Sequence, residues 1–372
     1  MSVKNPFYFG NEVHNDEFCN RISELKELKN DVTNGLNVLL YAPRRFGKTS
    51  LLKKLQNELA SDENTKVIFF DWLSISSVEE FLDKYFHTIA SSLESNSDKV
   101  MKLFKDMLQI RPNITMKMSN SSDITYGVSF TKKELDSSFE DIINLPFQYA
   151  KKSGKKVVVI FDEFQEAEQF EIEKKLRTLI QTHGGDVAYI FSGSKKSILS
   201  AMFNDKNRAF YKSVKHLVIK EIHLEDWIAF ATQRFLQTNK IIESHHIKTI
   251  FDITQGFPYY MQQLLYHVWE ACEKRVDEEM VQKALELMLE REYDLYAYIY
   301  SSLTPNQKIT LKYIILFDGT NLYANDTLSQ TSLSASTLKS TLESLLKKDI
   351  CDRVGDRYYL VDPLMKYWLE KN

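Results

Sequence analysis

The chain has 372 residues, of which 43% are hydrophobic, and its formal net charge at pH 7 is −3. This length predicts two or three domains, and the charge provides no overall attraction to nucleic acid. The three cysteines, Cys19, Cys272 and Cys351, are far apart in sequence, which argues against a disulfide framework or a zinc site and favours the reducing cytoplasm. No apolar run approaches the ~20 residues that cross a bilayer, so we expect no membrane span.

The first chemical motif lies at residues 42–49. It follows the apolar run Val38–Tyr41 and leads into a helical pattern, which is the strand–loop–helix context of a phosphate-binding P-loop. Unpaired N–H groups at the helix start attract an anion. Lys48 adds a charge for the β- and γ-phosphates, and Thr49 offers a hydroxyl to Mg²⁺. We expect ATP or ADP to bind at Ala42, Arg45, Phe46, Gly47, Lys48, Thr49 and Ser50.

The loop departs from the usual P-loop pattern at its first position, where Ala42 replaces glycine. Alanine lacks only ready access to positive φ, so the loop keeps its shape if Ala42 has a negative φ. A side chain at position 47 would block the approach of the backbone to the β-phosphate, and this position is Gly47. The P-loop prediction therefore survives the substitution.

The segment after the P-loop predicts a mixture of strands and helices. We expect a strand at 66–71, helices near 78–93 and 99–109, and a helix from about 135 to 152. Residues 112–132 alternate between polar and apolar types around a polar centre. This pattern predicts a β-hairpin inserted at the surface.

The second motif follows the continuous apolar run Val157–Phe161, which predicts a strand buried on both faces of a parallel sheet. Ligands of open α/β sheets bind outside the carboxyl ends of the strands, and Asp162 and Glu163 stand at such an end. We expect Asp162 to hold Mg²⁺, and Glu163 to orient or deprotonate the attacking water.

A third strand, at 187–191, follows a predicted helix over 170–183 and ends in two candidate polar residues, Ser192 and Ser194. Either hydroxyl could contact the γ-phosphate or the nucleophilic water. Alternatively, Ser194 caps the helix that begins near Lys195, because short polar side chains accept hydrogen bonds from the first N–H groups of a helix. The sequence leaves both interpretations open.

Helices dominate from about residue 222, with predicted helices at 225–238, 244–254, 258–274 and 278–289. Gly256 ends one of these helices and Pro258 starts the next, as is usual for these residue types. Further helices are predicted at 304–316, 325–330 and 335–348, the last with Ser334 as its N-cap. A hairpin with a turn at residues 355–356 follows. Three helices and a two-stranded wing predict a winged helix.

Together these motifs resemble the archaeal-type P-loop ATPases of the AAA+/STAND group. The resemblance extends over nearly the whole chain and rests on Phe18, Arg21, Glu24 and Leu28, the P-loop, residues 162–165, 191–194 and 256–259, and Asp362, Pro363, Leu364 and Trp368. It implies an α/β fold of the additional-strand, AAA+-like division. The expected domains are an ATPase core over 1–221, a helical lid over 222–295 and a winged-helix domain over 296–372. It also implies that Pro258 leans on the adenine and that the segment from Phe18 to Arg21 closes over the base.

We therefore expect a slow, Mg²⁺-dependent ATPase that acts as a nucleotide-driven switch or a remodelling motor. Its expected catalytic residues are Glu163, Lys48, Ser192 and Ser194, and its expected metal ligands are Thr49 and Asp162. Arginines from neighbouring subunits often stabilise the transferring phosphate. The candidates for such a role are Arg44, Arg45 and Arg208.

The alternative function is a nucleic-acid-binding protein whose ATPase is regulatory. Basic residues of the winged helix could contact phosphates; they are Lys339, Lys347, Lys348, Arg353 and Arg357. Acidic residues alternate with them, however, and winged helices also bind proteins. A protein partner or self-association is therefore expected as well.

Overall fold

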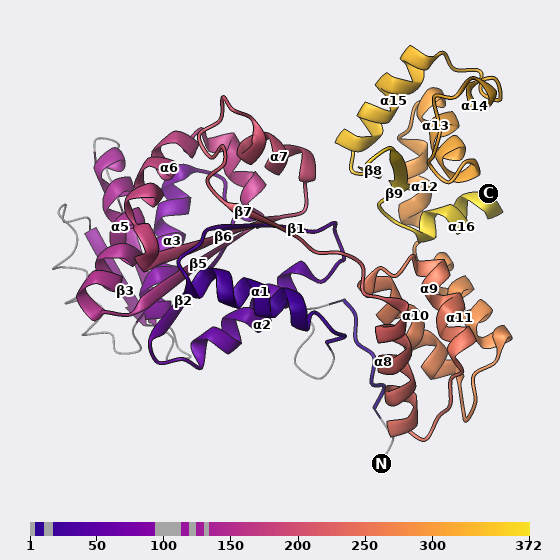
Figure 1. Ribbon diagram of the computed structural model, residues 1–372, viewed down its shortest axis with the longest axis horizontal. Helices are drawn as coiled ribbons and strands as arrows, with labels where there is room; N and C mark the ends of the chain where they lie inside the picture. Colours follow the sequence, from indigo (N-terminus) through magenta and orange to yellow (C-terminus); the bar gives the residue numbers. More distant parts are fainter. Residues whose placement is uncertain (1–3, 11–17, 94–112, 119–123, 130–133) are drawn as a thin grey trace. The chain divides into compact units, whose positions relative to one another are not determined.

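The computed structural model describes residues 4–10, 18–93, 113–118, 124–129 and 134–372 (Figure 1). The chain divides into two compact units. The first, here named the sheet unit, comprises residues 21–43 and 47–220. The second, named the helical unit, comprises residues 221–372 together with residues 44–46 and the described residues before 21. Among the described residues, no helix is long and apolar enough to cross a membrane.

The sheet unit contains a five-stranded parallel sheet with the strand order β2-β5-β6-β1-β7. Every residue of β1 and β6 is buried, as in strands that are covered on both faces. The predicted α/β fold with a parallel sheet is thereby confirmed. The strands are β1 (Val38–Tyr41), β2 (Thr65–Asp71), β5 (Lys156–Asp162), β6 (Val187–Gly193) and β7 (Lys215–Val218).

Helices cover both faces of this sheet, with α1 and α2 on one side and α3, α5 and α6 on the other (Figure 1). Successive side chains of β5 point to opposite faces of the sheet, so the strand packs against the helices on both sides. Val157, Val159 and Phe161 belong to the core that contains α3 and α5, while Val158 and Ile160 are buried on the opposite face. The helices are α1 (Ile22–Thr33), α2 (Lys48–Ala60), α3 (Val78–Leu93), α5 (Leu135–Ser153), η2 (Phe164–Phe170), α6 (Glu173–Thr182), η3 (Gly184–Asp186) and α7 (Lys196–Asn204).

The insertion between α3 and α5 contains two antiparallel strands, β3 (Asn113–Met118) and β4 (Ile124–Ser129). Tyr126 of β4 is buried in the core of the sheet unit, and its backbone N–H donates a 3.1 Å hydrogen bond to Nδ1 of His87 on α3. The hairpin is thus anchored on α3. The helix predicted at 99–109 and the centre of the hairpin lie outside the described residues.

The predicted helix over 170–183 is wrong at its start. Residues 164–170 form the 3₁₀ helix η2, and α6 begins only at Glu173. Glu171 has a left-handed φ of +55°, which a right-handed helix does not accommodate. The left-handed residue therefore separates the two helices.

The helical unit contains the four helices predicted after residue 222 and the predicted helix–helix–helix–hairpin order of a winged helix. Ser334 caps α15, because its side chain accepts a 3.2 Å hydrogen bond from Thr337 N. The helices α12 and α16 were not predicted. The elements are α8 (Leu224–Gln237), α9 (Ser244–Thr254), α10 (Pro258–Ala271), α11 (Glu278–Arg291), α12 (Tyr293–Ser301), α13 (Pro305–Leu316), α14 (Asn325–Leu328), α15 (Ala335–Lys347), β8 (Cys351–Val354), β9 (Arg357–Leu360) and α16 (Leu364–Lys371).

Candidate active site

The carboxyl ends of the parallel strands bring the sequence motifs together. Tyr41, at the end of β1, is the register partner of Gly193 in β6. Asp162, at the end of β5, is the partner of Asp71 in β2. The first turn of α2 follows β1, and it therefore lies at the same edge of the sheet as Asp162 and Ser192.

Asp162 is the centre of this site and is 3% exposed. Its Oδ1 lies 3.0 Å from the ammonium of Lys48 and accepts a 2.7 Å hydrogen bond from Ser192. Its Oδ2 accepts a 3.0 Å hydrogen bond from Thr49 Oγ1. Burial acts to raise the pKa of Asp162, but the charge of Lys48 and the hydrogen bonds from Ser192, Lys48 and the backbone N–H of Glu163 outweigh it and hold the pKa below its ordinary value. The carboxylate therefore stays ionised.

Glu163 is held from two sides. Its Oε1 lies 2.7 Å from Lys48 Nζ, and its Oε2 accepts hydrogen bonds from Ser194 Oγ at 3.2 Å and from the amide of Gln165. The backbone of Glu163 is left-handed, with φ +50°. The alternative in which Ser194 caps α7 is wrong, because the N-cap position is Lys195 and no side chain bonds there.

The P-loop has the backbone that the sequence requires. Ala42 is buried and is absent from the residues with positive φ, so alanine fits this position. Gly47 has φ +77° and is the N-cap of α2, which favours glycine whatever space surrounds it. Ser50, in the first turn of α2, is buried.

The donor set at this edge fits Mg²⁺. The ion prefers hard oxygen ligands and usually takes only one or two protein side chains, the rest being water and phosphate. The Thr49 hydroxyl and the Asp162 carboxylate supply such oxygens side by side. Within the described chain, no group of three or more His, Cys, Asp or Glu residues could hold a metal by itself.

Four of the predicted nucleotide-binding residues belong to the helical unit: Phe18, Arg45, Phe46 and Pro258. Pro258 is the first residue of α10, and the ring of Phe46 lies 4.6 Å from that of Phe257. Their contacts with a base stay predictions.

Arg21, in the sheet unit, is 4% exposed and donates hydrogen bonds to Glu24 and to the carbonyl of Lys220, so its guanidinium is held by protein groups.

Each candidate arginine finger has an acidic partner in its own unit. Arg44 pairs with Asp349 at 3.4 Å and Arg45 with Asp362 at 3.0 Å. Arg208 pairs with Glu168 at 3.0 Å and forms a two-pronged pair with Glu173.

Two residues at the site were not assigned a role from the sequence, Gln165 and Asp71. Gln165 contacts Glu163, as described above. Asp71 ends β2, and burial together with the charges of Asp162 and Glu163 raises its pKa, against a backbone hydrogen bond from Leu73. The position of Asp71 at a strand end was the signal that could have identified it.

Comparison with known proteins identifies the family. Residues 18–264 match the model of an ATPase domain found predominantly in Archaea. The chain belongs to this ATPase family. Residues 294–371 of this archaeal-type ATPase match the model of a probable winged helix domain. The predicted resemblance is thereby confirmed.

Two curated relatives of this archaeal-type ATPase are uncharacterized ATP-binding proteins of Methanocaldococcus jannaschii. One is 31% identical over 159 residues, which are 40% of this chain and 40% of the relative. The other is 34% identical over 134 residues, which are 34% of this chain and 32% of the relative. The matches thus span less than half of either relative.

Solved structures share the fold of this archaeal-type ATPase. A Walker-type ATPase of Pyrococcus abyssi has a TM-score of 0.67 at 18% identity and covers 98% of this chain and 99% of its own. The ORC2 protein of Aeropyrum pernix, in complexes with ADPNP and ADP, has a TM-score of 0.56 at 15% identity and covers 94% of this chain and 93% of its own.

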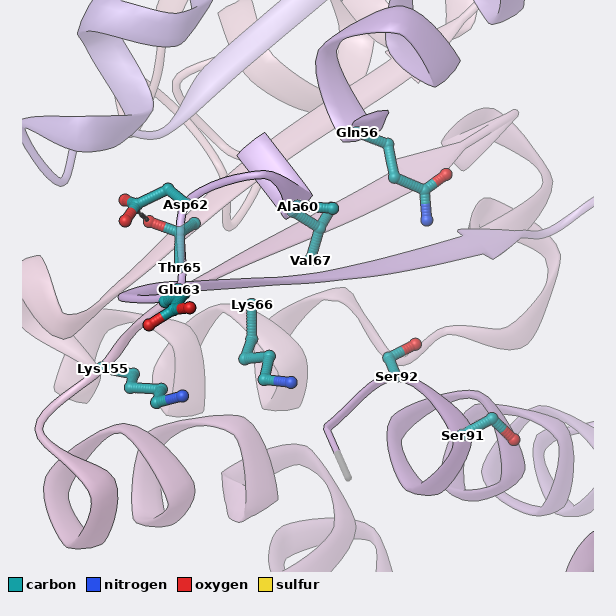
Figure 2. Close-up of a pocket in the computed structure, with 10 residues that line it drawn as sticks. All are labelled: Gln56, Ala60, Asp62, Glu63, Thr65, Lys66, Val67, Ser91, Ser92 and Lys155. Carbon is teal, nitrogen blue, oxygen red and sulfur yellow. Dashed lines mark hydrogen bonds between the residues drawn. The ribbon is translucent and has the colours of Figure 1, made fainter. Parts of the chain in front are cut away.

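A pocket of about 560 Å³ lies at the opposite end of β2 from Asp71 (Figure 2). Thr65 and Lys66, at the start of β2, belong to its lining, and Thr65 donates a 2.8 Å hydrogen bond to Asp62. None of the predicted site residues contributes to it. The remaining lining residues are Gln56, Ala60, Asp62, Glu63, Val67, Ser91, Ser92 and Lys155.

Proposed function

We propose that the protein is a Mg²⁺-dependent ATPase that hydrolyses ATP to ADP and phosphate. The observation that carries this proposal is the placement of Glu163 beside Lys48, at the edge of the sheet where Thr49 and Asp162 also lie. A carboxylate poised to activate water, a lysine for phosphate oxygens and two hard oxygen ligands are the parts that phosphoryl transfer to water requires.

In this proposal, each side chain has one task. Glu163 accepts a proton from water while the water oxygen bonds to the γ-phosphorus, and the bond from the γ-phosphorus to its bridging oxygen breaks as ADP leaves. Lys48 turns from the two carboxylates to the phosphate oxygens. Ser192 orients Asp162, and Ser194 orients Glu163. Thr49 and Asp162 would hold Mg²⁺, which when bound neutralises phosphate charge.

We further propose that turnover is slow and that the protein works as a switch. The three candidate arginine fingers support slow turnover, because each is already paired with an acid in its own unit. A nucleotide switch needs contacts that differ between ATP and ADP. The lid over 222–295, with Pro258, and the segment from Phe18 to Arg21 are the proposed source of such contacts.

The winged helix over 296–372 is proposed as a surface for a protein partner or for self-association. Two basic residues of its wing are engaged within the domain, since Arg353 pairs with Asp356 at 2.9 Å and Arg357 with Asp318 at 2.6 Å. This pairing disfavours the DNA-binding alternative. None of the three cysteines forms a disulfide in the described part of the chain, which supports the proposed cytoplasmic location.

The test is ATP turnover by the wild type and by Glu163→Gln, with ATP and ADP binding measured on both proteins. We expect slow turnover by the wild type, and retained binding without turnover by the variant. Binding without turnover in the wild type would contradict the ATPase proposal and leave a nucleotide-locked switch. Equal turnover in the two proteins would remove Glu163 from the mechanism.

A further inference from the structure

The position of the Glu163 carboxylate depends on a contact with Lys48, which a bound nucleotide would weaken. One of its oxygens contacts Lys48, at 2.7 Å. The same lysine is the residue that a phosphate of the nucleotide would attract. Once Lys48 turns to the phosphate, the hydrogen bonds from Gln165 and Ser194 to the other carboxylate oxygen remain as the described side-chain contacts that fix Glu163.

Gln165 is a buried amide, and packing alone does not explain why this position holds a polar side chain. It lies in η2 and is 3% exposed. Its Nε2 donates to Glu163, while its Oε1 is buried without a hydrogen-bond partner among the described residues. A buried carbonyl oxygen without a partner is unfavourable. A leucine would avoid that cost, so the amide is explained by the hydrogen bond that it donates to Glu163.

The chemistry of Glu163 fixes the orientation of this amide. An ionised carboxylate only accepts hydrogen bonds. The NH₂ group of Gln165 therefore faces Glu163, and the carbonyl oxygen faces the opposite way, towards Gly193 of β6.

Gly193 provides the space that the amide needs. A Cβ added at Gly193 would lie 1.9 Å from Gln165 Oε1, 3.1 Å from Gln165 Cδ and 2.9 Å from Leu199 Cδ1. Gly193 does not have a left-handed φ, so its backbone does not require glycine. The neighbouring side chains supply the reason. The shortest contact is with the amide, so a side chain at position 193 would displace Gln165 from Glu163, while Leu199 would have to shift as well.

We propose that Gln165 is a positioning residue that holds the Glu163 carboxylate in place for water activation, and that Gly193 acts through it. This inference rests on the proposed ATPase function. In this proposal, two segments that are separated in sequence, residues 162–165 and 191–194, together fix the orientation of Glu163. Gln165 touches neither nucleotide nor water in this proposal; it acts by keeping Glu163 oriented.

The test compares Gln165→Leu and Gly193→Ala with the wild type. A matched control is Gln169→Leu, in the same 3₁₀ helix, where the exposed amide donates only to the carbonyl of Glu166 in the described contacts. Loss of a hydrogen bond to a charged group should lower kcat roughly 10- to 100-fold. Nucleotide affinity and thermal unfolding should change little, and the control should resemble the wild type.

Two further readouts separate positioning from a general structural effect. In Gln165→Leu, kcat should fall while KM for ATP stays close to the wild-type value, because only the orientation of Glu163 is lost. In a Gln165→Ala background, Gly193→Ala should lower kcat much less than it does in the wild type, because the clash with the amide no longer exists and only the contact with Leu199 remains. Independent effects of the two substitutions would overturn the role assigned to Gly193.

A measurement without turnover keeps this inference apart from the ATPase proposal. In crystal structures with bound ADP, the Glu163 carboxylate should lose its wild-type orientation in Gln165→Leu and keep it in the Gln169→Leu control. This difference would support the positioning role even if the wild type hydrolyses no ATP, an outcome that contradicts the proposed function alone. An unchanged orientation of the Glu163 carboxylate, or a kcat equal to that of the Gln169→Leu control, would overturn the inference.

Discussion

Asp71 and Asp162 are direct partners in the parallel ladder between β2 and β5, so two neighbouring strands both end in a carboxylate. Their environments shift the pKa values of the two carboxyl groups in opposite directions. The pKa of Asp162 is lowered, with Lys48 as the strongest of the lowering influences, whereas burial and the charges of Asp162 and Glu163 raise the pKa of Asp71. One carboxylate is therefore stabilised in its charged form and the other is not.

We expect Asp71→Asn to raise the stability of the protein at neutral pH. A carboxyl whose pKa is raised by folding stabilises the folded state in acid, and this contribution is lost as pH rises through its folded pKa. Asparagine removes that loss and can still accept the hydrogen bond from Leu73 N. The measurement is the thermal unfolding midpoint in a series of buffers from about pH 4 to about pH 8, a range that begins near the ordinary pKa of a carboxyl group.

The control for this prediction is Asp136→Asn, since Asp136 is highly exposed and pairs with Lys175 at 2.9 Å. Its pKa is lowered, with the hydrogen bond from Lys175 as the main cause, so its replacement should leave stability unchanged or slightly lower at neutral pH. A midpoint for Asp71→Asn below that of the wild type at pH 7 would contradict the expected sign.

Lys48→Met should destabilise the sheet unit as well as abolish phosphate binding. Asp162 would remain buried without its cation, and removal of one partner of a buried ion pair costs about 3 kcal/mol or more. The double variant Lys48→Met/Asp162→Asn should recover part of this loss. Urea unfolding measures both variants, and Lys53→Met, on the same helix, is the control. A single variant as stable as the wild type would show that Asp162 is adequately solvated without Lys48.

His183 should make the protein sensitive to acid. It is fully buried between Tyr189 Oη at 2.7 Å and Asn144 Oδ1 at 2.8 Å, and burial lowers its pKa from 6.5 to about 4. As the pH falls, His183 of the unfolded chain therefore binds a proton at a higher pH than His183 of the folded chain does. Stability should fall by up to about 3 kcal/mol as pH drops from 6.5 to 4.

His183→Gln should flatten this pH dependence, although it also loses part of the hydrogen-bond network. The free energy of unfolding as a function of pH measures the effect, and His216→Gln, at an exposed position of β7, is the control. The attribution to His183 fails if the variant retains the full acid dependence of the wild type.

The pairing of the wing arginines with acidic residues of their own domain predicts that the winged helix makes few contacts with DNA phosphates. Each phosphate contact adds about 0.9 to the slope of log affinity against log salt concentration. We expect a slope close to zero for a duplex oligonucleotide, measured by fluorescence anisotropy. A steep slope that decreases in Arg353→Ala or Arg357→Ala would restore the nucleic-acid-binding alternative.

Much of the fold and of the site could be predicted because its signals are local. The apolar run before Asp162, the P-loop before Thr49 and the cap at Ser334 each need only a few neighbouring residues to be recognised. The break between η2 and α6 was missed, because the left-handed conformation of Glu171 is not typical of a glutamate.

The parts of the site that were missed depend on contacts between distant segments. Nothing local distinguishes Gln165 from other polar residues of η2; its role emerges only where β6 brings Gly193 against it. The choice between the two interpretations of Ser194 was likewise undecidable, because capping α7 and contacting the γ-phosphate or the water place the same short side chain at the same strand end.

The position of β1 within the sheet has a consequence for synthesis of the protein. This strand pairs with β6 on one side and β7 on the other, and both strands are translated long after it. While the chain emerges from the ribosome, the P-loop strand has no sheet partner until residues 187–193 have appeared, and its second edge stays open until residue 218. The nucleotide site is therefore among the last parts of the sheet unit to be completed, and a nascent chain arrested before β6 should be unable to bind ATP.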